Sequence, residues 1–117
     1  MSSDEEIFCS GDMDLAHLMA LIGPVVTGVP VATESGIVYG DGIWAISDAE
    51  LTDDWYDDDG GLPLSRYRFT IYVSGPNRYR LAKAAFDRLV HGTGLDLLWL
   101  SDLQVIQARR PALVSVA

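Results

Sequence analysis

The chain has 117 residues, of which 49% are hydrophobic, and its formal net charge at pH 7 is −9. This length and composition predict a single domain over residues 1–117 that buries one core without metals or disulfides. The charge disfavours nucleic acid and anionic membranes as direct partners, because both would repel the protein.

The charges divide unevenly along the chain. Residues 1–65 contain 14 acidic side chains and no Lys or Arg, whereas residues 66–117 contain 3 acidic and 8 basic ones, which gives net charges of −14 and +5. Ion pairs between the halves would neutralise part of this charge, although surface pairs stabilise little. Since an excess of five positive charges does not cancel fourteen negative ones, we expect an acidic surface on the folded protein.

The N-terminal region predicts a soluble cytoplasmic protein. Ser2–Glu6 is polar and acidic where a secretory signal would be basic and then apolar, and no run approaches the ~18 apolar residues of a membrane helix. Cys9 is the only cysteine, so no internal disulfide forms, which fits a reducing compartment. Cys9 follows Ile7 and Phe8 in an apolar run, which predicts a first strand with a buried, unreactive thiol.

A helix is expected next, capped by Ser10 or Asp12 and ending at Gly23-Pro24. Residues 25–33 are rich in β-formers but interrupted by Gly28 and Pro30, which indicates an irregular segment or an edge strand. The helix presents one apolar stripe, which consists of Leu15, Leu18, Met19 and Ile22.

Segments 36–39 and 43–46 flank Gly40-Asp41-Gly42, which favours a hairpin over one strand with a bulge. Residues 66–73 give the clearest strand, because apolar side chains from Tyr67 to Val73 that enter the core alternate with polar ones, and Arg66 and Arg68 face water or the acidic loop. A second helix follows Pro76 and ends near His91-Gly92. Residues 97–106 form one broken strand or two short ones.

This order of elements predicts an α+β fold of two layers. We expect a mostly antiparallel sheet of four to five strands with two helices on one face, in a ferredoxin-like arrangement. The oligomeric state stays open, because an edge strand near Val29 or Val114 could pair between copies.

Between the hairpin and the strand at 66–73 lies an acidic stretch, Asp48–Asp59, in which seven of twelve residues are carboxylates. Loops of this length in compact domains are usually functional or disordered, and the Trp and Tyr in this one are typical of interfaces. We therefore predict a contact surface for a basic protein, with Tyr39 or Trp44 as possible neighbours. The candidate partner-binding residues are Asp48, Glu50, Asp53, Asp54, Trp55, Tyr56, Asp57, Asp58 and Asp59.

Other chemistries find little support in the sequence. An EF-hand register with Gly60 at position 6 puts Trp55 at position 1 and Arg66 at position 12, so the motif fails at both ends, although a looser calcium site and a calcium-dependent binding module stay open. Zinc spacing and a nucleophile elbow are absent, and the two histidines and one cysteine lie far apart in the sequence. We therefore predict a protein that is not an enzyme and has no cofactor.

In size, acidity and order of elements, the chain resembles the small acidic immunity proteins of bacterial toxin–immunity systems. The resemblance implies a non-enzymatic inhibitor that neutralises a cognate basic toxin, such as a nuclease, by covering or distorting its active site. Phage-encoded acidic inhibitors that mimic nucleic acid and block a defence enzyme have the same composition and are the alternative within this class. A direct nucleic-acid surface from the arginines of the second half is less favoured, because a solvated helix face accounts for them.

Overall fold

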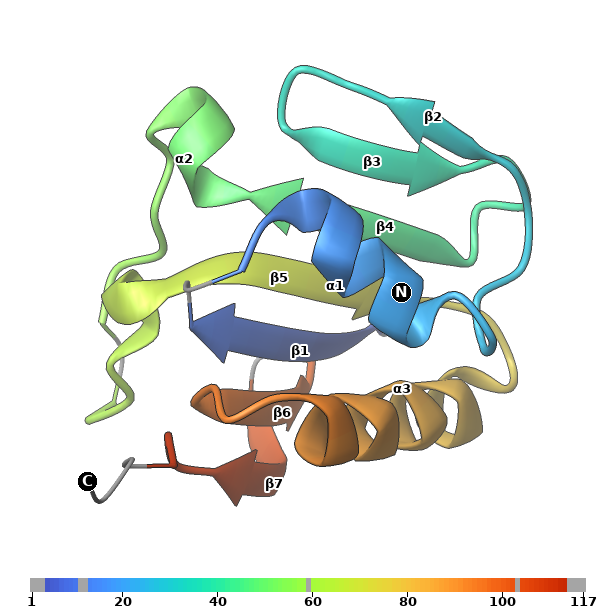
Figure 1. Cartoon of the computed structure of the whole chain (residues 1–117). Coiled ribbons are helices and arrows are strands. Elements are labelled where there is room, and N and C mark those ends of the chain that lie inside the picture. The colour runs from blue at the N-terminus through green and yellow to red at the C-terminus, as the bar shows by residue number, and fades with distance from the viewer. Residues whose placement is uncertain (1–3, 11–12, 59, 103, 114–117) are drawn as a thin grey trace.

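The computed structural model describes residues 4–10, 13–58, 60–102 and 104–113, so the predictions for Asp59 and Val114 lie outside the described residues. Its strands form one sheet in the order β2-β3-β4-β5-β1-β6-β7, and every neighbouring pair is antiparallel (Figure 1). The elements are β1 (Glu5–Ser10), α1 (Leu15–Ile22), β2 (Pro30–Ala32), β3 (Gly36–Tyr39), β4 (Trp44–Asp48), α2 (Ala49–Thr52), a 3₁₀ turn η1 (Leu64–Arg66), β5 (Tyr67–Val73), α3 (Arg78–Gly92), β6 (Leu97–Ser101) and β7 (Val105–Arg110).

The class α+β and the antiparallel sheet are as expected, but the predicted ferredoxin-like arrangement of four to five strands and two helices is wrong. The sheet has seven strands, and three α-helices accompany it. The edge strands were left open by the sequence. Residues 25–33, expected as an irregular segment or an edge strand, contain β2, whose three residues are exposed and begin with a proline. The strand expected at 97–106 is two strands, and β7 folds back on β6 through a turn in which Asp102 is left-handed (φ 53°) and continues to Arg110. The third helix, α2, is a single turn inside the acidic stretch, where the sequence predicted a loop.

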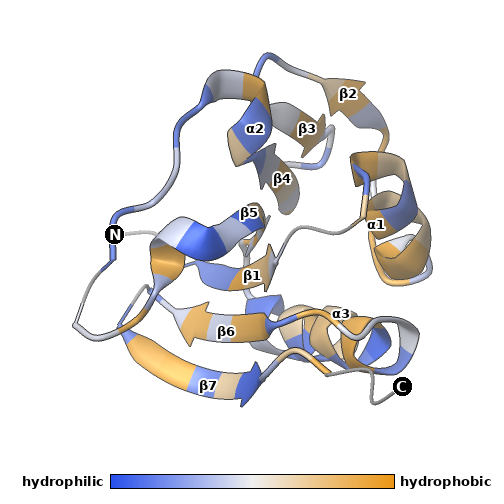
Figure 2. Ribbon diagram, turned by 60° about the vertical axis from the view of Figure 1, so that its left-hand side comes forward, coloured by the Kyte–Doolittle hydropathy of each residue, from blue (hydrophilic) through white to orange (hydrophobic). Residues whose placement is uncertain are grey.

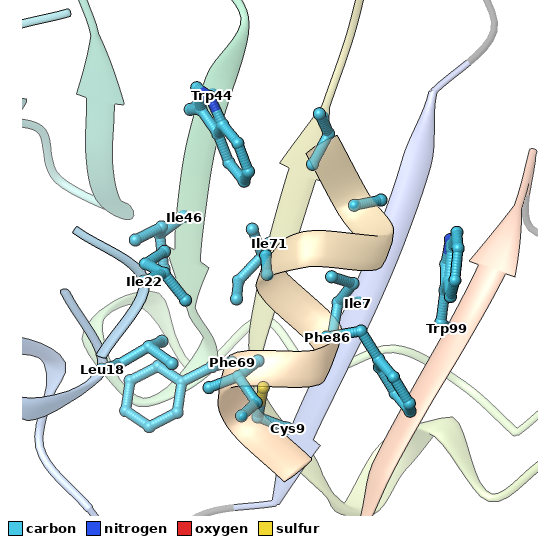
Figure 3. Packing of buried hydrophobic residues seen from close by; sticks show 14 of the residues in the cluster. Ile7, Cys9, Leu18, Ile22, Trp44, Ile46, Phe69, Ile71, Phe86 and Trp99 are labelled. Atoms are coloured by element: carbon cyan, nitrogen blue, oxygen red, sulfur yellow. The ribbon is translucent and has the colours of Figure 1, made fainter. Parts of the chain in front are cut away.

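One face of the sheet carries the main core under α1 and α3. Leu18 and Ile22 of α1 and Phe86 of α3 are buried against side chains that alternate inward from β1 and β5 (Figure 3). Asp14, and not Ser10 or Asp12, caps α1, because its Oδ1 accepts a hydrogen bond of 2.8 Å from the backbone N–H of His17. Among the described residues, no helix is both long and apolar enough to span a bilayer.

The opposite face of the sheet carries a second, smaller core over β1, β5 and β6. The chain between α2 and β5 crosses this face and supplies apolar side chains to it. The buried members of this core are Phe8, Leu64, Tyr67, Leu98 and Leu100, and Tyr56 and Leu62 pack against them half-buried. The acidic stretch is thus tied to the sheet over part of its length.

The predicted hairpin of residues 36–46 is confirmed as β3 and β4, in the register Ile37 to Ile46. Gly36 is required at its open end, because a Cβ there would lie 2.0 Å from the carbonyl oxygen of Ile46. Any other residue would force the two strands apart.

Candidate functional site

We call residues 48–58, which comprise the end of β4, α2 and the following segment, the acidic strap. Its first carboxylate, Asp48, is 1% exposed. The Asp48 side chain caps α2 by accepting a hydrogen bond of 3.1 Å from the N–H of Glu50. It also accepts two from Arg68, from Nε at 2.9 Å and from Nη2 at 3.0 Å. Asp48 is therefore occupied within the molecule and anchors the strap.

Arg68 reaches Asp48 because of an irregularity in β5. The β1–β5 register passes from Cys9 opposite Phe69 to Ser10 opposite Tyr67, so Arg68 has no partner on β1. This bulge turns Tyr67 toward the second core, instead of the main core that strict alternation predicted. The hydrogen bond to Asp48 raises the pKa of Arg68, which keeps the guanidinium charged beside the carboxylate.

The middle of the strap is held by Tyr56. Its ring packs edge-on against Phe8, with 5.2 Å between centroids and 79° between planes. Its hydroxyl is hydrogen-bonded to that of Tyr72 on β5. Burial, together with this bond, raises the pKa of Tyr72. Tyr56 is half-buried, and its ring and hydroxyl hold the strap to the sheet.

A third attachment lies at Asp58. Its Oδ1 accepts hydrogen bonds from the Ser65 hydroxyl at 2.6 Å and from the Ser65 backbone N–H at 3.0 Å. These two bonds lower the pKa of Asp58, the hydroxyl contributing most. The strap is thus fixed at its start, middle and end.

Between these attachments, three carboxylates remain free. Asp53, Asp54 and Asp57 are exposed, and within the part of the chain that the structure describes none of them makes a hydrogen bond or ion pair. Glu50 is also exposed, at 56% of its side chain, but lies 3.4 Å from Arg68 Nη1. Trp55 is half-buried. The strap therefore presents unpaired negative charge beside a half-buried tryptophan.

The two halves of the chain do neutralise each other in part. Ion pairs that join them link Arg68 to Asp48 and Glu50, and Arg78 to Glu5. Other basic residues pair within the second half and so leave the acidic half unchanged; these pairs are Arg66 and Arg109 with Asp96, and Lys83 with Asp87. Internal pairing therefore reaches two of the strap's carboxylates and leaves the three described above unpaired.

Tyr39 and Trp44, which the sequence placed as possible neighbours of the acidic surface, are 7% and 1% exposed in the main core. They are structural residues. Conversely, the residues that position the strap could not be identified from the sequence; they are Arg68, Tyr72, Phe8 and Ser65. Alternation along 66–73 assigned Arg68 to solvent or to the acidic loop as a whole, and only the bulge directs it to one carboxylate.

In the described ranges, no group of three or more His, Cys, Asp or Glu side chains is arranged to hold a metal ion. The chain matches no protein-family model, no curated protein and no solved structure.

Proposed function

We propose that this protein is a non-enzymatic inhibitor that binds a basic protein through the acidic strap, as an immunity protein binds its toxin. The observation that supports the proposal is the combination of a fixed backbone with free charges. Asp48, Tyr56 and Asp58 hold the strap to the sheet, whereas Asp53, Asp54 and Asp57 have no internal partner among the described residues. A surface that is already ordered loses little conformational entropy on binding.

The charge and the ring have separate roles in this proposal. Exposed carboxylates attract a cationic surface over a distance of about 10 Å at moderate salt and so accelerate encounter. The indole of Trp55 then supplies apolar contact area, which is the kind of contact that dominates binding energy at interfaces. A nuclease is a suitable target, because a site that binds phosphate is itself cationic.

The test uses the partner that the protein captures from its native host, purified and assayed for its own activity. Asp53→Asn with Asp54→Asn should lower the association rate about tenfold at low salt and flatten its salt dependence. The dissociation rate should change much less, and inhibition should weaken accordingly.

The chain offers a control matched in charge and exposure in Asp87→Asn with Asp102→Asn, although these two side chains, unlike those of the strap pair, have partners in Lys83 and the backbone N–H of Asp4. This pair removes the same charge from exposed positions on α3 and in the β6–β7 turn. Asp102 and Asp53 both have a left-handed backbone with φ 53°, so each pair places one Asn in a conformation that Asn readily adopts. If the control pair slowed association as much as the strap pair, net charge and not the strap would be responsible, and the proposal would be wrong.

A further inference from the structure

One row of side chains crosses the sheet on the face away from α1 and α3. Adjacent members are cross-strand partners: Val31 with Val38, Val38 with Ala45, and Ala45 with Tyr72. The row lies on this face because its neighbours in sequence, such as Ile46 and Ile71, enter the main core. We call these four residues the valine row.

The β2–β3 half of the valine row is left uncovered, whereas Ala45 and Tyr72 are half-buried. The chain between α2 and β5 covers Phe8, Leu98 and Leu100, on the other side of Tyr72. On the β2–β3 side, Val31 is 53% and Val38 43% exposed. Figure 2 shows this hydrophobic character on β2 and β3 at one edge of the sheet. Adjacent exposed apolar side chains of this kind are typical of binding surfaces.

The valine row is continuous with the acidic strap. Tyr72, its last member, is hydrogen-bonded through its hydroxyl to Tyr56 of the strap. Exposed carboxylates also stand in the turns at the two ends of β3, Glu34 before it and Asp41 after it. The apolar row is therefore bordered by negative charge on several sides.

We propose that the valine row is the second half of the partner-binding surface and takes apolar side chains of the basic partner that lie among its Lys and Arg residues. This inference rests on the proposed function and extends its contact area. A side of a stable interface contains about 20–30 residues; the strap has 11 residues and the row adds four, so the row brings the surface closer to that size. Because they meet at Tyr56 and Tyr72, one partner covers both.

Charge favours this occupant over a second copy of the chain, and this surface over the apolar one on β7. A second copy of the chain, docked on the same face, would bring its own strap carboxylates to an already negative surface. Val105 and Ile106, which are also exposed, lie on β7 with Arg109 and Arg110, and a basic partner would be repelled there.

The test uses two peptides of equal charge, each with six lysines separated by serines, of which the second has two serines replaced by leucine. The leucine peptide should bind about tenfold more tightly and dissociate more slowly. In amide NMR spectra, both should perturb residues 50–57, and the leucine peptide alone should perturb Val31, Val38, Ala45 and Tyr72.

Val31→Thr with Val38→Thr should remove the advantage of the leucine peptide and leave the lysine peptide unaffected. Threonine keeps the shape and strand preference of valine, so the fold is preserved. The control is Val105→Thr with Ile106→Thr, at residues that are 56% and 52% exposed, and it should change neither affinity.

The outcomes separate the two proposals. If neither peptide binds the strap, the proposed function and this inference both fail. If the lysine peptide binds there but leucine adds nothing, or the β7 control has the same effect as the valine changes, only this inference fails. A concentration-dependent dimer in sedimentation that the valine changes abolish would identify a second copy as the occupant and would also overturn it.

Discussion

Arg68 and Asp48 form a two-point pair, with both Asp48 oxygens accepting hydrogen bonds from the guanidinium at 2.9 and 3.0 Å. The pair joins β5 to the start of the acidic strap. The side chains are 20% and 2% exposed, so the carboxylate is nearly removed from water. The charge of Asp48 is therefore used in an internal ion pair. The strap's unpaired carboxylates follow Asp48 in the chain.

Replacing Arg68 with Ala should destabilise the protein by about 3 kcal/mol, because the change leaves a buried carboxylate unpaired. Urea denaturation followed by tryptophan fluorescence measures the difference. Lys83→Ala is the control, since it breaks an exposed i,i+4 pair with Asp87, and such pairs contribute about 0.3–0.5 kcal/mol. Equal losses in the two variants would mean that the Asp48 pair does not anchor the strap.

Tyr56→Phe and Tyr56→Ala should separate the two contacts that hold the middle of the strap. The Phe variant loses only the hydrogen bond to Tyr72, at a cost of about 1 kcal/mol. The Ala variant also loses the ring contact with Phe8, for a total of about 2–3 kcal/mol. Amide hydrogen exchange should accelerate at residues 53–58 in the Ala variant and much less in the Phe variant. Unchanged exchange in the Ala variant would mean that Tyr56 does not fix the strap.

The pH dependence of the stability that Asp58 contributes should depend on Ser65. Because the hydrogen bonds from Ser65 lower the pKa of Asp58, the folded state binds fewer protons than the unfolded state. The contribution of Asp58 to stability is therefore fully present above about pH 4, the ordinary carboxyl value, and is lost as the pH falls through the lowered pKa.

Ser65→Ala should raise the pKa of Asp58 toward that ordinary value, but not all the way, because the backbone N–H of residue 65 still donates. Carboxyl carbon NMR titration measures the shift directly. An unchanged Asp58 titration would exclude the Ser65 hydroxyl as the cause.

Cys9 should be inert in the native protein. It is fully buried in β1, and burial raises the pKa of its thiol to about 12, so almost no thiolate exists at pH 8. An aromatic disulfide reagent should react at a rate limited by unfolding in buffer and within seconds in 6 M guanidinium. Rapid reaction in buffer would show that β1 opens locally.

Most of the helices and strands could be predicted from patterns among residues that are close together in the sequence. The 3.6-residue apolar spacing located α1 and α3, the alternation in 66–73 located β5, and Gly40-Asp41-Gly42 located the β3–β4 turn. The edge strands stayed ambiguous, because β2 and β7 bury little and so leave no apolar period to detect: residues 25–33 fitted an irregular segment or an edge strand, and residues 97–106 fitted one broken strand or two. The strand count, and with it the ferredoxin-like arrangement, was wrong for that reason.

For the candidate site, the sequence predicted the total charge but not which carboxylates are free. Composition alone determined that an acidic surplus must remain on this protein, since eight basic residues do not neutralise seventeen acidic ones. Which carboxylates carry it was decided only by the tertiary structure. Asp48 and Asp53 are chemically identical and five residues apart, but a bulge in a strand twenty residues away from Asp48 brings Arg68 to one and not the other. A hydrogen bond requires two atoms within about 3 Å of each other in space, and the separation of two residues in the sequence does not show whether they come that close.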